Sequence, residues 1–250
     1  MPVIKRHLIA LALLLTPSVQ LAAQSKACGI ESPPEPKSWK NVPCEVAPES
    51  SDARLRALRR ARDAVFDDPT GMKRPEDLAP NPSASRGRSA GFPLELPPLP
   101  VSESDAVIIG KVVRYQPYFS NDRTAIYHEL TVEIQSVLKD KSYRAVGGDT
   151  LAILGEGGSL RLPDGRIFTD FVPPQIQDDI RVGGRYVLFL LYRSNGDYFA
   201  RLKAWELRAG RVVPMAFSDL RKAQAGKLPL AGMPEAAFLA EVRDSVLRSP

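Results

Sequence analysis

Few side chains in this sequence have the type and spacing that catalysis or metal binding requires. Of its two histidines, His7 lies in an N-terminal stretch that we expect to be cleaved off, which leaves His128. A single histidine excludes His-rich zinc sites and two-histidine metal motifs. A serine–histidine–acid triad needs a nucleophile motif, and the nearest look-alike is Ser159 after two glycines. On its predicted strand, His128 lies on the same face as the residues that we expect to point into the core. We therefore interpret it as structural, with a catalytic role in a hydrolase as the alternative.

The acidic residues predict neither an acid–base pair nor a metal site. Asp178 and Asp179 are adjacent, and neighbours on a strand point to opposite faces, so they do not form a general acid–base couple. With Asp164 and Asp170 they could surround a calcium ion, but the EF-hand spacing is missing, and we interpret them as solvated loop acids. The glycine-rich stretch 155–159 lacks the lysine and helix of a phosphate-binding loop. We predict no catalytic residue, no bound metal and no cofactor.

The cysteine content indicates one structural cross-link. Only Cys28 and Cys44 are present, and in an exported chain an even pair forms a disulfide more often than a redox pair. Their spacing is far from Cys-x-x-Cys, and two thiols alone do not fill a zinc site. We predict that a disulfide joins Cys28 to Cys44 and closes a short loop.

Four aromatic residues around one loop are our candidates for ligand binding: Tyr115, Tyr118, Phe119 and Tyr127. We expect them to cluster, exposed, at one end of a β-barrel, where loops and the adjoining strand face bind ligands. The interpretation that we favour is that these rings close the end of the barrel and serve only packing.

The N-terminus predicts export. Lys5 and Arg6 precede an apolar run over 8–15, and Ala22-Ala23 offers a cleavage site, so we interpret residues 1–23 as a signal peptide cut after Ala23. The run is too short for a stable membrane span. Cleavage lowers the formal net charge from +5 to +3, without a concentrated basic stripe, which argues against a nucleic-acid partner. We expect a periplasmic or secreted monomer whose partner is a protein or glycan of the cell envelope.

Residues 24–103 form a proline-rich N-terminal segment. Thirteen of the 23 prolines fall in it, and proline lacks the amide donor that an interior strand needs. We expect one helix over about 52–66 and a linker over 67–100, with 83–91 mobile.

Arginines decorate the predicted helix. Four positions recur at helical spacing and predict a narrow apolar stripe: Leu55, Leu58, Ala61 or Arg62, and Val65. The arginines are Arg54, Arg56, Arg59, Arg60 and Arg62. We interpret the helix as a solvated surface helix docked on the barrel, with a basic amphipathic helix for an anionic surface as the alternative.

Residues 104–250 carry the globular domain. The longest apolar run outside the N-terminus, over 186–192, is bounded by turn signals and predicts a strand over 185–192 that is covered on both faces. Strand 125–138 alternates, and we expect Ile126 to face the core while Tyr127 and Glu129 face water. Further strands are expected over 105–114, 149–154, 197–207 and 211–213. Five to six short strands with hairpins predict a mainly β fold, a small closed or half-closed barrel.

A helix is expected to follow Pro234 at the C-terminal end. Its apolar stripe is predicted to contain Phe238, Leu239, Val242, Val246 and Leu247.

Four stretches of this domain resemble the netrin-module superfamily, which includes the tissue inhibitors of metalloproteinases and many exported bacterial proteins: 105–112, 137–139, 148–151 and 182–190. The resemblance covers Ser104 to Pro214 and implies an oligonucleotide/oligosaccharide-binding (OB) barrel. It does not imply a function, because folds do not carry functions.

The inhibitors of this superfamily chelate the zinc of the protease through an N-terminal cysteine within a Cys-x-Cys motif. In this sequence Cys28 is followed by Gly29-Ile30, and the proline-rich segment separates it from the barrel. We therefore predict an exported, non-enzymatic binding or interaction module on an OB-like barrel. The alternatives are a metalloprotease inhibitor acting through an N-terminal Cys28 and a hydrolase using His128.

Overall fold

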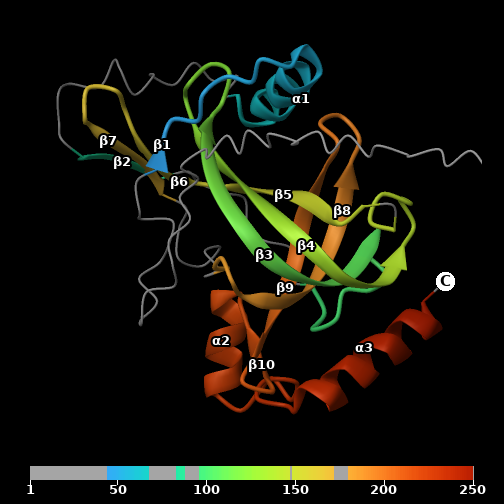
Figure 1. Cartoon of the computed structure of the whole chain (residues 1–250). Coiled ribbons are helices and arrows are strands. Elements are labelled where there is room, and N and C mark those ends of the chain that lie inside the picture. The colour runs from blue at the N-terminus through green and yellow to red at the C-terminus, as the bar shows by residue number, and fades with distance from the viewer. Residues whose placement is uncertain (1–43, 68–82, 88–95, 147, 172–179, 250) are drawn as a thin grey trace, which may run out of the picture.

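The computed structural model describes residues 44–67, 83–87, 96–146, 148–171 and 180–249. Within these residues the protein is mainly β, with a six-stranded sheet (the main sheet), a four-stranded sheet (the small sheet) and a helix at the C-terminal end (Figure 1). The predicted mainly β fold with a C-terminal helix is confirmed.

The main sheet contains the strands that the sequence predicts. They are β3 (Ala106–Phe119), β4 (Ile126–Asp140), β5 (Thr150–Glu156), β8 (Arg185–Arg193), β9 (Tyr198–Arg208) and β10 (Arg211–Pro214). Their order is β10-β9-β5-β4-β3-β8, and β8 also pairs with β9. The β5–β9 pair is parallel and the other pairs are antiparallel. Because β8 pairs with both β3 and β9, β8 is not an edge strand.

Strand β8 is buried on both faces, as predicted. Tyr186, Leu188 and Leu190 are fully buried in one apolar cluster. Val187 and Phe189, which alternate with them, are fully buried in a second cluster on the opposite face. Successive side chains of a strand point to opposite faces, so an uninterrupted apolar run is stable only where both faces are covered.

The small sheet joins the proline-rich segment to a hairpin. Its strands, in spatial order, are β1 (Cys44–Glu45), β6 (Gly158–Arg161), β7 (Ile167–Phe171) and β2 (Ser83–Gly87). The proline-rich segment thus supplies only the edges, as its composition predicts. The prediction of a mobile linker over 83–91 is wrong for β2, which pairs in parallel with β7. Small polar residues give little strand signal, and the pairing comes from backbone groups of a distant hairpin.

The helices are α1 (Ala53–Asp63), continued by the 3₁₀ turn η2 (Ala64–Phe66), then α2 (Phe217–Gln224) and α3 (Glu235–Arg248). Helix α1 lies at its predicted position, whereas α2 was not predicted. Phe238 and Val242 of α3 are fully buried, but Leu247 is 85% exposed, so its place in the predicted stripe is wrong. Leu247 lies about two and a half turns after Phe238, on the opposite side of the helix. No described helix has the length and apolar character to cross a bilayer.

One outer side of the main sheet is covered by apolar side chains of α3 and of the segment before β3. Trp205 of β9 lies against Phe238, with ring centroids 5.2 Å apart. Val101 is buried in the same cluster, and the indole of Trp205 donates a hydrogen bond to the carbonyl of Pro98 over 3.0 Å. Helix α1 lies over β4, on another part of the outer face of the main sheet (Figure 1).

Candidate functional site

Helix α1 lies across strand β4, between the loop 120–125 and the β8–β9 turn. At the loop, the side-chain amide of Asn121 donates to the carbonyl of Arg60 over 3.1 Å, and the backbone N–H of Asp122 donates to Asp67 over 3.0 Å. At the turn, Arg62 reaches two backbone carbonyls. We call this surface the α1 face. It consists of Tyr118, Tyr127, Glu129, Leu154, Tyr198 and the carbonyls of Gly196 and Asp197.

The local sequence favours a helix that presents one charged side to the α1 face. Asp52 caps its N-terminus by accepting the N–H of Arg54 over 2.7 Å, and basic residues in the last turn suit the helix dipole. The contacts to the α1 face come from positions i, i+3, i+4 and i+7 of one side of the helix. These residues are Arg59, Arg62, Asp63 and Phe66.

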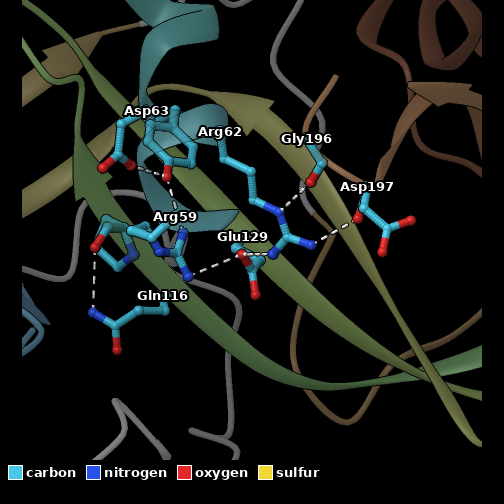
Figure 2. A network of polar contacts seen from close by, with 9 residues as sticks. Arg59, Arg62, Asp63, Gln116, Glu129, Gly196 and Asp197 are labelled. Carbon is cyan, nitrogen blue, oxygen red and sulfur yellow. Dashed lines mark hydrogen bonds and ion pairs between the residues drawn. The ribbon is translucent and has the colours of Figure 1, made fainter. Parts of the chain in front are cut away.

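The guanidinium of Arg62 is surrounded by three acceptors (Figure 2). Its Nη1 donates to Glu129 Oε2 over 2.7 Å, Nε donates to the carbonyl of Gly196 over 2.8 Å, and Nη2 donates to the carbonyl of Asp197 over 2.7 Å. The side chain of Arg62 is only 9% exposed. Donors on all three nitrogens of the fork are therefore engaged, and this is the geometry that a planar guanidinium fits and an ammonium does not.

Arg59 shares the same carboxylate and also lies on an aromatic ring. Its Nη2 is 3.1 Å from Glu129 Oε2, and its guanidinium carbon lies 3.4 Å from the centre of the Tyr118 ring. Burial by itself would lower the pKa of Arg59, but the charge of Glu129 and the phenols of Tyr127 and Tyr118 raise it overall. Arg59 is therefore held in its charged form, in a cation–π contact and an ion pair at once.

Tyr127 links the helix to the sheet through its hydroxyl. The hydroxyl donates to Asp63 Oδ1 and accepts from Arg59 Nη1 over 2.9 Å. Burial raises the pKa of Tyr127, so it remains a phenol that can donate. Burial also raises the pKa of Asp63, an effect that the Tyr127 hydrogen bond and the charge of Arg59 partly offset.

Phe66 supplies the apolar contact between η2 and the α1 face. Its ring stacks on Tyr127 with centroids 4.5 Å apart and planes 6° apart. Leu154 of β5 and Tyr198 of β9 complete this cluster. One aromatic residue thus anchors the end of a helix whose other contacts are polar.

Two predictions about this region are wrong. Leu55 and Val65, placed in the apolar stripe, are 52% and 39% exposed, because the helix docks with its arginine side instead. Tyr127 and Glu129, placed on the wet face of β4, are covered: Tyr127 is fully buried and Glu129 binds two arginines. The expectation that the helix docks on the sheet is confirmed.

The four aromatic candidates do not form one exposed cluster. Tyr118 and Tyr127 lie beneath α1, and Phe119 faces Phe168 of the small sheet at 6.2 Å. Tyr115 stacks on His128 with centroids 5.3 Å apart. Tyr115 and Tyr127 are 2% and 0% exposed, so the prediction of exposed rings is wrong for both. A role of these four residues in ligand binding stays a prediction.

His128 is buried, as its parity predicts. Its Nδ1 lies 2.9 Å from the carbonyl of Gly157, so Nδ1 carries the proton and donates. A Cβ at Gly155 would lie 2.5 Å from His128 Nε2, so the ring needs a glycine at that position. Ser159, the look-alike nucleophile, is fully buried and bonded to Thr169 over 2.9 Å. Both side chains are thus held in local contacts.

The remaining candidates are placed only in part. Asp164 binds Arg166 in an exposed turn, whereas Asp170 is buried and accepts the N–H of Ile126 over 3.0 Å. Asp178, Asp179, Cys28 and the signal peptide lie outside the described residues. Cys44 is buried in β1, and its disulfide with Cys28 stays a prediction. Among the described residues no group of three or more His, Cys, Asp or Glu could hold a metal ion.

In chemical terms, the α1 face offers a carboxylate, backbone carbonyls and aromatic rings. Such groups bind and orient a cationic or aromatic ligand. No model of a protein family matches the chain, and no curated protein sequence matches it.

Proposed function

We propose that the protein is an exported, non-enzymatic binding module and that the strands of its main sheet form a small OB-like barrel. The pairings of β3 with β4, β4 with β5, β5 with β9, β9 with β8 and β8 with β3 support this barrel. OB barrels bind ligands on the face of their second and third strands and on the loops beside it, after the first and fourth strands.

The observation that carries the proposal is the position of α1. In the OB-like reading, β4 and β5 are the second and third strands, the loop 120–125 follows the first strand, and the β8–β9 turn follows the fourth. Helix α1 contacts β4, the loop and the turn, and Phe66 of η2 shares an apolar cluster with Leu154 of β5. A segment of the chain therefore occupies the place where such a barrel takes its ligand, and this supports a face that recognises polypeptide.

The proposal is tested by presenting the helix as a separate peptide. In the full-length Arg59→Ala/Arg62→Ala variant the acceptors of the α1 face lose their occupants. We expect a fluorescent peptide of residues 49–67 to bind this variant saturably in an anisotropy titration, and a scrambled peptide of the same composition not to bind.

A matched control uses two exposed arginines of the same helix. The Arg54→Ala/Arg60→Ala variant removes the same net charge but leaves the docking side intact, so its own helix should keep the peptide out. If the peptide fails to bind the helix-released variant, or binds no better than its scrambled form, the α1 face is not a binding site for polypeptide and the proposal fails.

A further inference from the structure

We infer that the α1 face contains a guanidinium-recognition site and that the partner it fits is an arginine-bearing helical segment, which competes with α1 for the face. This inference rests on the proposed function, and it names the ligand of that same site. Helix α1 then serves as a built-in occupant that keeps the site closed.

The first reason is the completeness of the pocket around Arg62. Three acceptors from two elements converge on one guanidinium at 2.7 to 2.8 Å, and two of them are backbone carbonyls of a tight turn. Carbonyls at fixed positions remain in place when the arginine leaves. A lysine ammonium at this position could not reach acceptors on three sides of a planar fork. The site is therefore selective for arginine.

The turn is also shaped for the stem of the arginine side chain. A Cβ at Gly196 would lie 3.1 Å from Arg62 Cγ and 3.0 Å from the ring of Tyr198. Contacts of that length are tighter than ordinary van der Waals packing, so an alanine at this position would push Arg62 or Tyr198 back by a few tenths of an ångström. The sequence predicts Gly196 only as a hairpin residue, whereas the structure gives it a second role at the site.

The second reason is that the adjoining contacts define a motif. Arg59 lies on the ring of Tyr118 and beside Glu129. Asp63 accepts a hydrogen bond from the Tyr127 hydroxyl, and Phe66 stacks on the Tyr127 ring. Together with Arg62 they read Arg-x-x-Arg-Asp-x-x-Phe along one side of a helix. A competing partner segment is expected to carry this spacing.

The third reason is that the resident helix is held in a way that permits exchange. Its contacts are mainly charged, and the desolvation of buried charges offsets much of their attraction. Leu55 and Val65 remain exposed, so docking uses little of the apolar surface of α1. A tethered helix acts at an effective concentration of about 1 mM. For an intrinsic Kd of about 10 μM between α1 and the face, a free peptide would bind roughly 100-fold more weakly to the closed protein than to one whose helix is released.

Chemical rescue tests the pocket directly. In full-length Arg62→Ala protein, N-ethylguanidinium at millimolar concentration should raise the hydrogen-exchange protection factors of α1 at least tenfold. Ethylammonium at the same concentration should leave them unchanged. Arg54→Ala protein, treated in the same way, should respond to neither. Equal effects of the two cations, or no rescue, would overturn the guanidinium site.

A second variant covers the case in which Arg62→Ala does not fold. Arg62→Lys keeps the charge and the stem but loses the fork, so α1 should still lose at least tenfold in protection. Retention of full protection in Arg62→Lys contradicts selectivity for guanidinium.

Peptide titrations show whether the guanidinium ligand is part of a peptide or a small compound. They also distinguish failure of the guanidinium site from failure of the binding module. Added to Arg59→Ala/Arg62→Ala protein, the peptide 49–67 should bind at least tenfold more tightly than the same peptide with Arg62→Lys, and at least tenfold more tightly than arginine amide. Equal affinity of the two peptides sinks the guanidinium site while the binding module stands. If arginine amide binds as tightly as the peptide 49–67, the ligand is a small guanidinium compound and the proposal of a helical partner is wrong. Rescue without peptide binding sinks the binding module and the helical partner, and leaves only the guanidinium pocket.

Discussion

Helices cover two parts of the outer face of the main sheet, which we call the α3 side and the α1 side, and different forces hold them. Under α3, Phe238 and Val242 are fully buried against Trp205 and the strand face. Under α1, two arginines and an aspartate bind a glutamate, a tyrosine and carbonyl groups. The first side buries apolar surface, which is stabilising in proportion to its area. The second buries charge, which costs desolvation and leaves a smaller net stabilisation.

This difference indicates that α3 belongs to the folded core whereas α1 is docked on it. Apolar contacts are non-directional and cannot be exchanged for water without a large loss. Charged hydrogen bonds specify one partner geometry and can be exchanged for those of a similar partner. Substitutions under α3 and under α1 should therefore differ in the size and in the extent of their effects.

The largest effect is expected on the α3 side. Phe238→Ala removes a fully buried ring that packs on Trp205, and it should lower the free energy of global unfolding by about 3–5 kcal/mol. Thermal or urea unfolding measures this loss. Leu247→Ala, at an 85% exposed position of the same helix, should stay within about 0.5 kcal/mol of the wild type. A small effect of Phe238→Ala would contradict the assignment of α3 to the core.

Arg62→Ala should act on the α1 side alone. It leaves the carboxylate of Glu129 and two carbonyls without their main donor, and we expect docking of α1 to weaken by about 3 kcal/mol. Native-state hydrogen exchange should show the loss in α1, with little change in β8. Arg54 is exposed on the same helix. The Arg54→Ala variant is therefore the control and should keep the protection of α1. An equal loss in β8 would mean that α1 is part of the global unfolding unit and that the two sides do not differ.

A smaller effect is expected at the turn that receives Arg62. Gly196→Ala crowds Arg62 Cγ and Tyr198, which should weaken docking of α1 by about 1 kcal/mol. In the Arg62→Ala background the crowding is partly relieved, so the two effects should not be additive in a double-mutant cycle. Additive effects would show that Gly196 matters only for the turn.

The smallest effect is a pH dependence confined to the α1 side. Burial raises the pKa of Asp63 when the helix is docked, so the docked state binds the proton more tightly. This contribution favours docking below the ordinary pKa of an aspartate and is lost as pH rises through the raised value. Asp63→Asn should remove it, changing the difference in α1 docking between pH 4 and pH 7 by less than about 1 kcal/mol. At α3, the pH dependence of unfolding should be the same in Asp63→Asn and in the wild type. If the pH dependence of α1 docking is also unchanged in Asp63→Asn, Asp63 is not the source of that pH dependence.

Local patterns were sufficient for most of the main sheet. The apolar run over 186–192 lies in β8, and the turn at Asn195-Gly196 joins it to β9. Such features depend on residues that are close in the sequence, where strand alternation and turn chemistry act directly. Strand β2 and helix α2 carried no comparable signal, because small polar residues and a short uncapped helix take their structure from neighbours far along the chain.

The sequence by itself determined that α1 is a helix, that β4 is a strand and that His128 faces inward, because each follows from a period of a few residues. Only the tertiary structure decided which side of α1 docks. Arg62 meets Glu129 at a separation of 67 residues, and the carbonyls of Gly196 and Asp197 at 134 and 135 residues. From the sequence alone, an arginine on a helix is predicted to be a solvated charge. The fold instead places a carboxylate and two carbonyls around Arg62. That arrangement belongs to the fold of the strands and not to the pattern of the helix.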